Sequence, residues 1–509
     1  MEMKSRGIRR SSLSPYLLFL VLLVSLSKAS PSSSNGELPP PGVVSRIAFG
    51  SCSNQSAPQV HESIYFFQII TGSTVFSVTN ICYRCNYRFL QSIWDAVLDF
   101  DPQVFIWLGD NIYGDNKRPF RIMGKERTIG PWKNVPRFFP STEEEMRRRY
   151  LLAKGNPGYS NLRQTAQVIG TWDDHDYGLN DAGKEFSKKE INQRLLLDFL
   201  DEAEDSPRRR QDGVYTSYIF GPSGKQIKII LLDTRYHRDP LFSDGTILGD
   251  SQWQWLENEL YGPESEITII ASSIQVVSNL SAITSPLFYP ESWGRFPKER
   301  KRLYKLVKDS KAELNFHLFG VLMRSGIFFI SGDVHFGEIT RYDCGEQYPL
   351  YDITSSGLTQ AIEKVVPKLF AFLVRAIAWW TPSTMRVYSS ECRYRSCTYA
   401  QPNFGAIQII WDEVPQRIRV EVRDSNGDPA TAIDILLSDL QSIDTNKIIG
   451  RPMKYEHHCL LESELPCFWR HSFAFIVFAS SAGLLLAMIL LAYTIASASK
   501  KFLLKFKID

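Results

Sequence analysis

Residues 103–115 read "QVFIWLGDNIYGD", in which an apolar run ends abruptly at Gly109 and Asp110. Apolar runs of four to eight residues are typical of buried strands. The same change from an apolar run to a polar loop recurs at 43–54, 166–178, 227–239, 266–275 and 327–338. The sequence therefore predicts a set of buried strands, each of which ends in a polar loop.

Amphipathic stretches separate several of these strands and predict helices at 92–100, 141–153, 187–203 and 251–260. Strands that alternate with helices favour an α/β fold. Ligands of such sheets bind in the loops at the carboxyl ends of the strands. The last part, residues 403–440, instead reads as strands joined by turns, which predicts an antiparallel edge of the same domain. We therefore expect one α/β domain at 43–440.

Composition narrows the classes of function. The chain has 509 residues and is 44% hydrophobic, so it can bury a sizeable core. Its net charge is only +3, which gives no support for a nucleic-acid partner. Any function must therefore come from local sites.

The two ends of the chain predict targeting segments. Residues 1–30 combine basic residues, a short apolar run at 17–26 and small residues, as a secretory signal peptide does. Residues 473–496 carry no charge and are long enough to span a membrane, and lysines follow them directly. We expect a type I membrane protein with a lumenal domain, a juxtamembrane segment at 441–472 and a cytosolic tail at 497–509.

The final residues "KFKID" place Lys505 and Lys507 as in the dilysine signal that returns proteins to the endoplasmic reticulum. Coat-protein recognition of this tail is one reading, and a merely basic flank is the other. In a lumenal domain the eight cysteines are expected to pair or to bind metal. Asn54 and Asn279 begin glycosylation sequons, although Asn54 lies within the predicted active site.

Several of the polar loops carry metal-ligand chemistry. Oxygen and imidazole donors follow three of the strands, at Asp110, Tyr113, Asp174, His175, Asp333 and His335. Such donors suit Fe, Mn, Zn or Ca. Each residue alone has a simpler interpretation, as a turn aspartate, a half-buried aromatic or a hydrogen-bonded loop histidine. Their recurrence after successive strands is what favours a metal centre.

The order Gly-Asp-x-x-Tyr, Asp-His-Asp, Gly-Asp-x-His resembles the calcineurin-like metallophosphoesterases. With "FGSCSN", "LLDTRYHRD" and "YDITSSGLTQ", it is most similar to their alkaline phosphatase D (PhoD-like) branch. The resemblance covers roughly 43–425. It implies an αββα sandwich with two or more metal ions, Fe(III) with Ca, or Mn or Zn in their place. Such a pair clamps a phosphate and activates the water that attacks phosphorus.

The resemblance also implies residue roles. Cys52, Tyr113 and His335 would hold the first metal, Asp110 would bridge the two, and Asp174 and Asp333 would hold the second. Asp173 could also hold the second metal in place of Asp174. We prefer Asp174 because it directly precedes His175. His175 would give a proton to the leaving oxygen or stabilise it.

Two further roles stay open at this point. Arg235 could bind the phosphate oxygens, and a structural salt bridge with a neighbouring aspartate is an equal alternative. The superfamily usually has another histidine ligand from a later strand, where this chain offers Gln275 or nothing.

Residues 60–91 interrupt the expected passage from the Cys52 loop to the first helix. Every Val codon begins with GT, as introns do, and Gln91 can be encoded by CAG, which ends in AG as introns do. The 32 residues of this segment also keep the reading frame. We therefore hypothesise that 60–91 is a retained intron. A genuine insertion is the alternative. We interpret residues 313–324 as a second insertion, which lengthens the loop before a predicted strand, and either insertion could inactivate this isoform.

The leading function is a membrane-anchored, lumen-facing phosphoric ester hydrolase. A binding ectodomain without catalysis is the alternative, against which the intact motif residues argue. A thiol oxidoreductase would need Cys82 and Cys85 at the start of a helix, and "NICYRCNYRF" has no helix start.

Overall fold

The computed structural model describes residues 42–55, 93–117, 138–241, 243–263, 265–278, 280, 290–312, 326–343, 349–366, 371–381, 385–441 and most of 475–497. Several predicted features lie outside these ranges: the signal peptide at 1–30, the segments 60–91 and 313–324, Asn279, nearly all of 441–472 and 497–509, and Cys82, Cys85, Cys344, Cys459 and Cys467.

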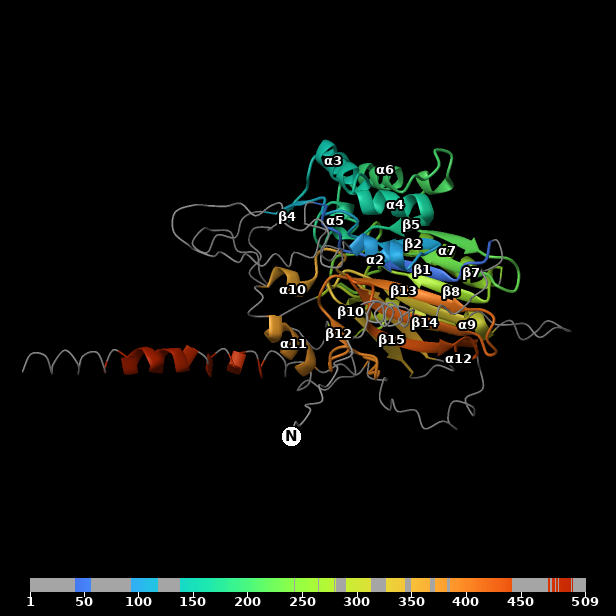
Figure 1. Cartoon of the computed structure of the whole chain (residues 1–509). Coiled ribbons are helices and arrows are strands. Elements are labelled where there is room, and N and C mark those ends of the chain that lie inside the picture. Colours follow the sequence, from blue (N-terminus) through green and yellow to red (C-terminus); the bar gives the residue numbers. More distant parts are fainter. Residues whose placement is uncertain are drawn as a thin grey trace, which may run out of the picture. The chain divides into compact units, whose positions relative to one another are not determined.

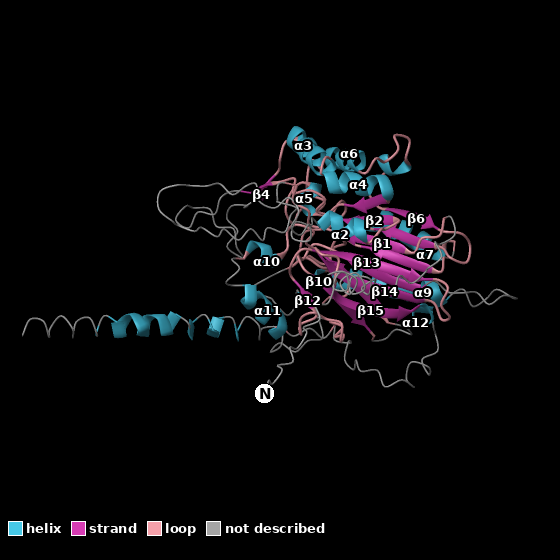
Figure 2. Ribbon diagram, viewed as in Figure 1, coloured by secondary structure: helices cyan, strands magenta, loops and turns pink. Residues whose placement is uncertain are grey.

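Two mixed sheets form the body of the described domain (Figures 1 and 2). The six-stranded sheet has the order β15 (Pro429–Leu436), β14 (Arg417–Asp424), β13 (Asn403–Ile410), β1 (Arg46–Gly50), β2 (Val104–Leu108) and β5 (Gln167–Thr171). The seven-stranded sheet has the order β12 (Thr398–Tyr399), β10 (Gly337–Tyr342), β11 (Leu350–Ser355), β9 (Gly326–Ser331), β8 (Ile267–Ala271), β7 (Ile227–Leu231) and β6 (Thr216–Phe220). A short ribbon joins β3 (Asn116–Lys117) and β4 (Phe138–Phe139).

The strands predicted from apolar runs are present and form the parallel part of each sheet. β1, β2 and β5 run parallel in one sheet, and β7, β8 and β9 run parallel in the other. The polar loops that follow these strands therefore all lie at the carboxyl ends of the parallel strands, on the same side of each sheet. The predicted antiparallel edge is confirmed as well, because β13, β14 and β15 pair antiparallel beside β1.

Helices connect the strands and flank the sheets. They are α2 (Ile93–Asp99), α3 (Glu143–Lys154), α4 (Pro157–Thr165), α5 (Asp174–Tyr177), α6 (Lys189–Phe199), α7 (Gly249–Tyr261), α9 (Pro297–Ala312), α10 (Ile362–Val365), α11 (Ala371–Trp380) and α12 (Leu437–Gln441), with the short 3-10 turns η3 (Pro207–Arg209) and η4 (Trp293–Arg295). The four predicted helices are confirmed as α2, α3, α6 and α7. The helix predicted at 187–203 ends at Phe199, and Asp201 beyond it has a φ of 57°.

Three clusters of buried side chains hold these layers together. One cluster combines residues of both sheets, such as Phe49 and Ile330, and fills the space between them. A second joins the six-stranded sheet to α2, α3, α4 and α6, and a third joins the seven-stranded sheet to α7 and α9. Helices therefore cover the outer face of each sheet, and the predicted α/β class is confirmed.

The described part of the C-terminal region is helical. Phe478–Ile495 has a mean hydropathy of 2.0 and buries none of its length, and among the described residues it is the one helix long and apolar enough to cross a membrane. Length and composition alone support that assignment. The helix lies within the span predicted at 473–496.

One disulfide joins Cys392 and Cys397, in the loop between α11 and β12. Cys52 is free and buried. Disulfides of this kind persist in oxidising compartments.

Candidate metal centre

The predicted ligands meet where the carboxyl ends of the two sheets face each other. Cys52, Asp110 and Asp174 follow β1, β2 and β5 of the six-stranded sheet, whereas Asp333 and His335 follow β9 of the other. Ligand atoms lie within 4.8 Å of one another in each of the groups Cys52/Asp110/His335, Asp110/Asp174/His175 and Asp173/Asp174/Asp333. Asp110 and Asp174 each belong to more than one group, as expected for a centre that holds two adjacent cations.

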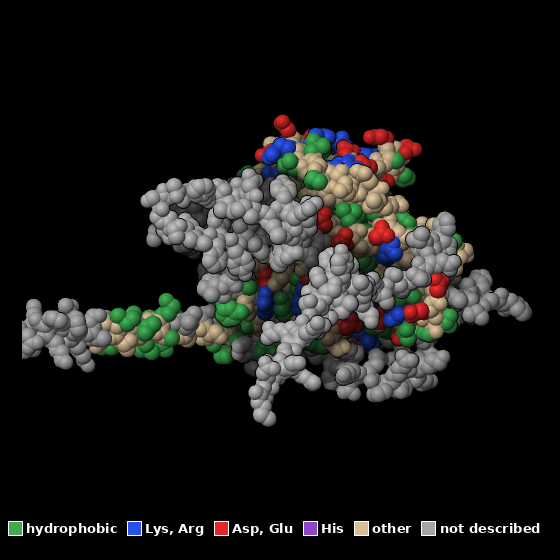
Figure 3. Space-filling model, in the orientation of Figure 1, with side chains coloured by type: hydrophobic (Ala, Val, Ile, Leu, Met, Phe, Trp, Pro, Cys, Tyr) green, Lys and Arg blue, Asp and Glu red, His purple; other side chains and the backbone are tan. Residues whose placement is uncertain are grey.

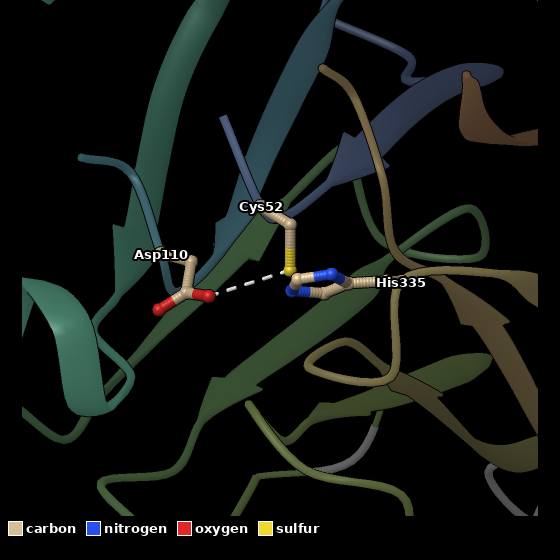
Figure 4. Close-up of side chains that lie close together, drawn as sticks. All are labelled: Cys52, Asp110 and His335. Carbon is tan, nitrogen blue, oxygen red and sulfur yellow. Dashed lines mark hydrogen bonds between the residues drawn. The ribbon is translucent and has the colours of Figure 1, made fainter. Parts of the chain in front are cut away.

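The first group is arranged around the thiol of Cys52 (Figure 4). Its Sγ lies 3.4 Å from Asp110 Oδ2 and 3.0 Å from Ser356 Oγ. Tyr113 Oη lies 3.0 Å from His335 Nε2, which brings the tyrosine to the same side. Burial, followed by the charge of Asp110, raises the pKa of the Cys52 thiol well above its usual value. A cation would offset both effects and favour the thiolate.

The backbone at four of these residues is left-handed. Cys52, Asp110, Asp333 and His335 have φ values of 59°, 51°, 70° and 62°. Each such residue costs about 1–3 kcal/mol, and strain of this kind gathers at functional sites. Surrounding contacts hold the conformation; the backbone N–H of His335, for example, donates to Ser356 Oγ at 2.8 Å.

Gly109 lets two of the ligand loops approach each other. It has a φ of 90°, and a Cβ at this position would collide with the backbone and side chain of Asp173. Only glycine therefore fits between the loop that carries Asp110 and the loop that carries Asp174.

The two neighbouring aspartates of "WDDHD" point to different surroundings. Asp173 accepts hydrogen bonds from Arg235 Nε at 2.6 Å and Ser273 Oγ at 2.8 Å. Asp174 lines the cavity described below, and its Oδ1 is buried with no hydrogen-bond partner in the described structure. An unpartnered buried carboxylate oxygen is costly unless something positive binds it. Asp173 Oδ2 is buried without a hydrogen-bond partner among the described residues as well, but Asp173 is paired with Arg235 and does not line the cavity, so the geometry favours Asp174 as the ligand.

Two other aspartates position the site, although the sequence assigned them no role. Asp176 is buried and accepts the backbone N–H groups of Asp110, Asn111 and Asp173 at 3.3, 3.2 and 2.6 Å. Asp115 Oδ1 lies 2.7 Å from His175 Nδ1, and its other oxygen accepts the Asn180 N–H. The second Gly-Asp pair in "GDNIYGD" was the available signal for Asp115.

His175 lies between the carboxylates and the cavity. With Nδ1 on Asp115, its other ring nitrogen remains available. Burial alone would lower the pKa of His175, but Asp174, Asp110 and Asp115 raise it well above its ordinary value. Burial and then His175 lower the pKa of His335 to about 4, which keeps that imidazole neutral and able to bind a metal. The two histidines are therefore suited to different tasks.

The site holds more negative than positive charge. Burial, followed by neighbouring aspartates, raises the pKa of Asp333 well above its usual value, and burial likewise raises that of Asp110. Burial would also raise the pKa of Asp174, but His175 and Arg235 lower it to about 2. Crowded buried carboxylates with raised pKa values are what bound cations would stabilise. The donor atoms are a thiolate sulfur, carboxylate and phenolate oxygens, and an imidazole nitrogen. Such a set fits Fe, Mn, Zn or Ca.

Arg235 lies behind the ligands instead of facing the cavity. It is fully buried, pairs with Asp173 and Glu291, and does not line the cavity. Arg238 adds a second pair to Glu291 at 3.0 Å. These contacts favour the structural salt bridge over the phosphate contact.

Replacing Arg235 by alanine should therefore destabilise the fold. Breaking one side of a buried ion pair leaves an uncompensated charge and costs about 3–5 kcal/mol. We expect a fall of that size in the free energy of unfolding, measured by denaturant titration. Arg417→Ala, which removes exposed pairs with Glu413 and Asp434, is the matched control and should change it by less than about 1 kcal/mol. A stable Arg235→Ala protein with only a raised KM would instead support phosphate binding.

A cavity of about 620 Å³ opens onto the centre. The cationic side chains of Lys117 and Arg148 line it. It is also lined by six residues predicted from the sequence to form the site: Asp110, Tyr113, Asp174, His175, Asp333 and His335. Arg149 also lines it and donates to the backbone carbonyls of Tyr113 and Asp115 at 3.1 and 2.9 Å, which fixes the ligand loop. Arg148 is exposed on α3 and was not singled out by its sequence pattern.

The structure also places Gln275 and Asn54, two further residues considered in the sequence analysis. Gln275 is buried and donates to Glu338 and Thr354, both at 3.0 Å, and it does not line the cavity. Asn54 lines the cavity, and its backbone N–H donates to Thr359 Oγ1 at 2.7 Å. A glycan on Asn54 would occupy the cavity.

Comparison with known proteins gives a family match. The model of the PhoD-like phosphatase family matches residues 81–363, which is more than half of the chain. Alkaline phosphatase D of Bacillus subtilis (strain 168) is 23% identical over 265 residues, which are 45% of this chain and 40% of that protein. The match thus spans less than half of the length of this curated relative.

Two solved structures also match. One is described as the structure of PhoD, with a TM-score of 0.46, 17% identity, and coverage of 78% of this chain and 73% of that one. The other is GAP50, the anchor in the inner membrane complex of Plasmodium, with a TM-score of 0.39, 11% identity, and coverage of 84% and 98%.

Proposed function

The chain belongs to the PhoD-like phosphatase family, and on that premise we propose that it is a metal-dependent phosphoric ester hydrolase with an αββα metallophosphoesterase fold. The observation that carries the proposal is the cluster of buried acidic, thiol and imidazole groups at the shared edge of the two sheets. Its unpartnered Asp174 oxygen and raised carboxylate pKa values are what bound cations would satisfy.

We assign Cys52, Tyr113 and His335 to one cation, Asp174 and Asp333 to a second, and Asp110 to both. When bound, such cations polarise the phosphoryl group and lower the pKa of a water molecule. Fe(III) with Ca is our first choice for their identities, and Mn or Zn are the alternatives.

The residues around the centre have complementary tasks. Lys117 and Arg148 line the cavity and would bind the phosphate oxygens. His175, held at Nδ1 by Asp115, would donate a proton from Nε2 to the leaving oxygen. Asp176 and Asp115 are positioning residues, because they fix the loops and the ring that act.

We further propose that Phe478–Ile495 anchors the protein in a membrane with the domain on the lumenal side. The helix carries no charge and has a mean hydropathy of 2.0, and the Cys392–Cys397 disulfide suits an oxidising lumen. The lysines of the tail would then be open to coat-protein recognition in the cytosol, which keeps the protein in the endoplasmic reticulum.

Metal removal tests the proposed activity. The full chain should contain at least two metal ions by elemental analysis and should hydrolyse members of a panel of phosphomonoesters, phosphodiesters and phospholipids. Chelation should lower this hydrolysis by at least about 1,000-fold, because metal ions supply several kcal/mol of transition-state stabilisation. Adding metal back should restore it.

A second sample lacking residues 60–91 controls for an inactive isoform. If both samples bind no metal and hydrolyse nothing, the proposed function is wrong. If only the shortened chain is active, the retained-intron hypothesis gains support and the assignment of the centre stands.

A further inference from the structure

The helix α11 exposes an apolar face. Phe372, Leu373, Ile377 and Trp379 are 61%, 43%, 49% and 63% exposed, and Ala376 between them is exposed as well. Their spacing of one, four, five and seven residues places them on one side of the helix. A helix on the surface of a water-soluble domain normally turns its polar side outward. None of these five exposed side chains is charged (Figure 3 colours hydrophobic side chains green and Lys and Arg blue).

One flank of α11 is fixed to the domain. Arg375, its only charged residue, makes a two-pronged ion pair with the buried Glu363, at 2.9 and 2.8 Å. The guanidinium also lies 4.8 Å from the ring of Tyr394. The Arg375 side chain is 41% exposed, whereas Glu363 is buried, so the ion pair ties the helix to the domain from beside its apolar face.

This attachment leads directly to the metal centre. Ile362, next to Glu363, donates its backbone N–H to the carbonyl of His335 at 3.1 Å, and Gln360 lines the cavity. The segment from Gln360 to Glu363 therefore links the cavity wall to α11.

We propose that α11 lies in the surface of a lipid bilayer, with its apolar face among the acyl chains. The proposal rests on the membrane anchor proposed above. Residues 442–474 connect the domain to the apolar C-terminal helix, and a chain of that length reaches at most about 115 Å. A linker of that length allows a bilayer that holds Phe478–Ile495 to reach α11.

The chemistry of the face favours lipid over a protein partner. A protein interface surrounds its apolar core with polar, hydrogen-bonding residues. Exposed aliphatic and aromatic residues that include a tryptophan are typical of helices at membrane interfaces. Arg375 is already paired, so binding depends on apolar area and should be insensitive to salt and to anionic lipid. Docking would bring the cavity to the headgroup layer, where phosphoesters of lipids lie.

Lipid photocrosslinking tests the docking. The full chain is reconstituted in phosphatidylcholine vesicles that contain a phosphatidylcholine with a photoactivatable acyl chain, and labelled peptides are mapped by mass spectrometry. We expect label in 371–381 as well as in 475–497. The control is 216–220, where Ile219 is 47% exposed, nearly as much as Ile377 at 49%. That peptide should carry no label.

Matched variants sharpen the result. Ile377→Glu and Phe372→Glu should each reduce label in 371–381 by at least roughly tenfold, because a buried carboxylate is costly in lipid. Ile219→Glu should leave the label unchanged. Hydroxyl-radical oxidation of Trp379 should fall in vesicles together with the appearance of lipid label.

Other outcomes separate the proposals. Label only in 475–497 overturns the docking of α11 and leaves the anchor intact. Label only in 371–381 supports docking and overturns the anchor. Protection of Trp379 without lipid label means that protein covers the face, which also overturns the proposal. None of these outcomes depends on hydrolytic activity.

Discussion

Asp110→Asn should lower phosphoester turnover by at least about 1,000-fold. The Asp110 carboxylate belongs to both the Cys52/His335 group and the Asp174/His175 group, so an amide there weakens both cation sites at once. Loss of several kcal/mol of charge stabilisation corresponds to that factor in rate. His335→Ala should have a comparable effect. Turnover and metal content are measured together, and both should fall.

Asp101→Asn is the control for Asp110. Asp101 has nearly the same backbone conformation, with φ values of 52° and 51°, and its exposed side chain pairs with Arg46 away from the centre. The substitution should leave turnover and metal content unchanged. Wild-type turnover in Asp110→Asn would show that the centre is assigned to the wrong residues.

His175→Asn should lower kcat by about 100- to 10,000-fold, the contribution typical of a positioned proton donor. Unlike Asp110→Asn, it should retain the metal, because His175 is not one of the proposed ligands. Asp115→Asn should also lower kcat, but by a smaller factor. It removes only the carboxylate that holds the His175 ring at Nδ1 and leaves the ring itself in place. Turnover is measured with a poor and a good leaving group, and the poor one should suffer more.

His237→Asn is the control for His175. Its ring lies outside the cavity, with Nε2 3.0 Å from the carbonyl of Asp212. Equal losses for good and poor leaving groups in His175→Asn would rule out proton donation and leave a structural role.

The fold was predictable where periodicity and composition act locally. The runs before Cys52, Asp110 and Asp333 are largely apolar on both sides of the strand, as parallel strands buried between layers must be. The distribution of those strands between two sheets depends on long-range pairing, such as that of β1 with β13. No local pattern encodes that pairing. The helix α11 was missed because an apolar stretch of ten residues fits a buried strand or helix equally well.

The meeting of the proposed ligands was predictable because each of them lies in a loop that follows a strand. The roles of charged neighbours were not, because their partners are distant in sequence. Arg235 pairs with Asp173 and Glu291, which are 62 and 56 positions away in opposite directions. Asp115 and His175 are 60 positions apart. Arg148 lines the cavity only because the folded chain places α3, the helix that carries it, beside the cavity.

The division of the ligands between two sheets couples metal affinity to folding. Cys52, Asp110 and Asp174 come from one sheet, and Asp333 and His335 from the other, so a shared cation binds fully only when the sheets are in register. By linkage, whatever loosens the packing of Phe49 against the facing sheet lowers the affinity for the cation, and the cation in turn resists separation of the sheets. The proposed centre would thus hold the two sheets together, and metal supply to the compartment would help to determine how long the folded protein lasts.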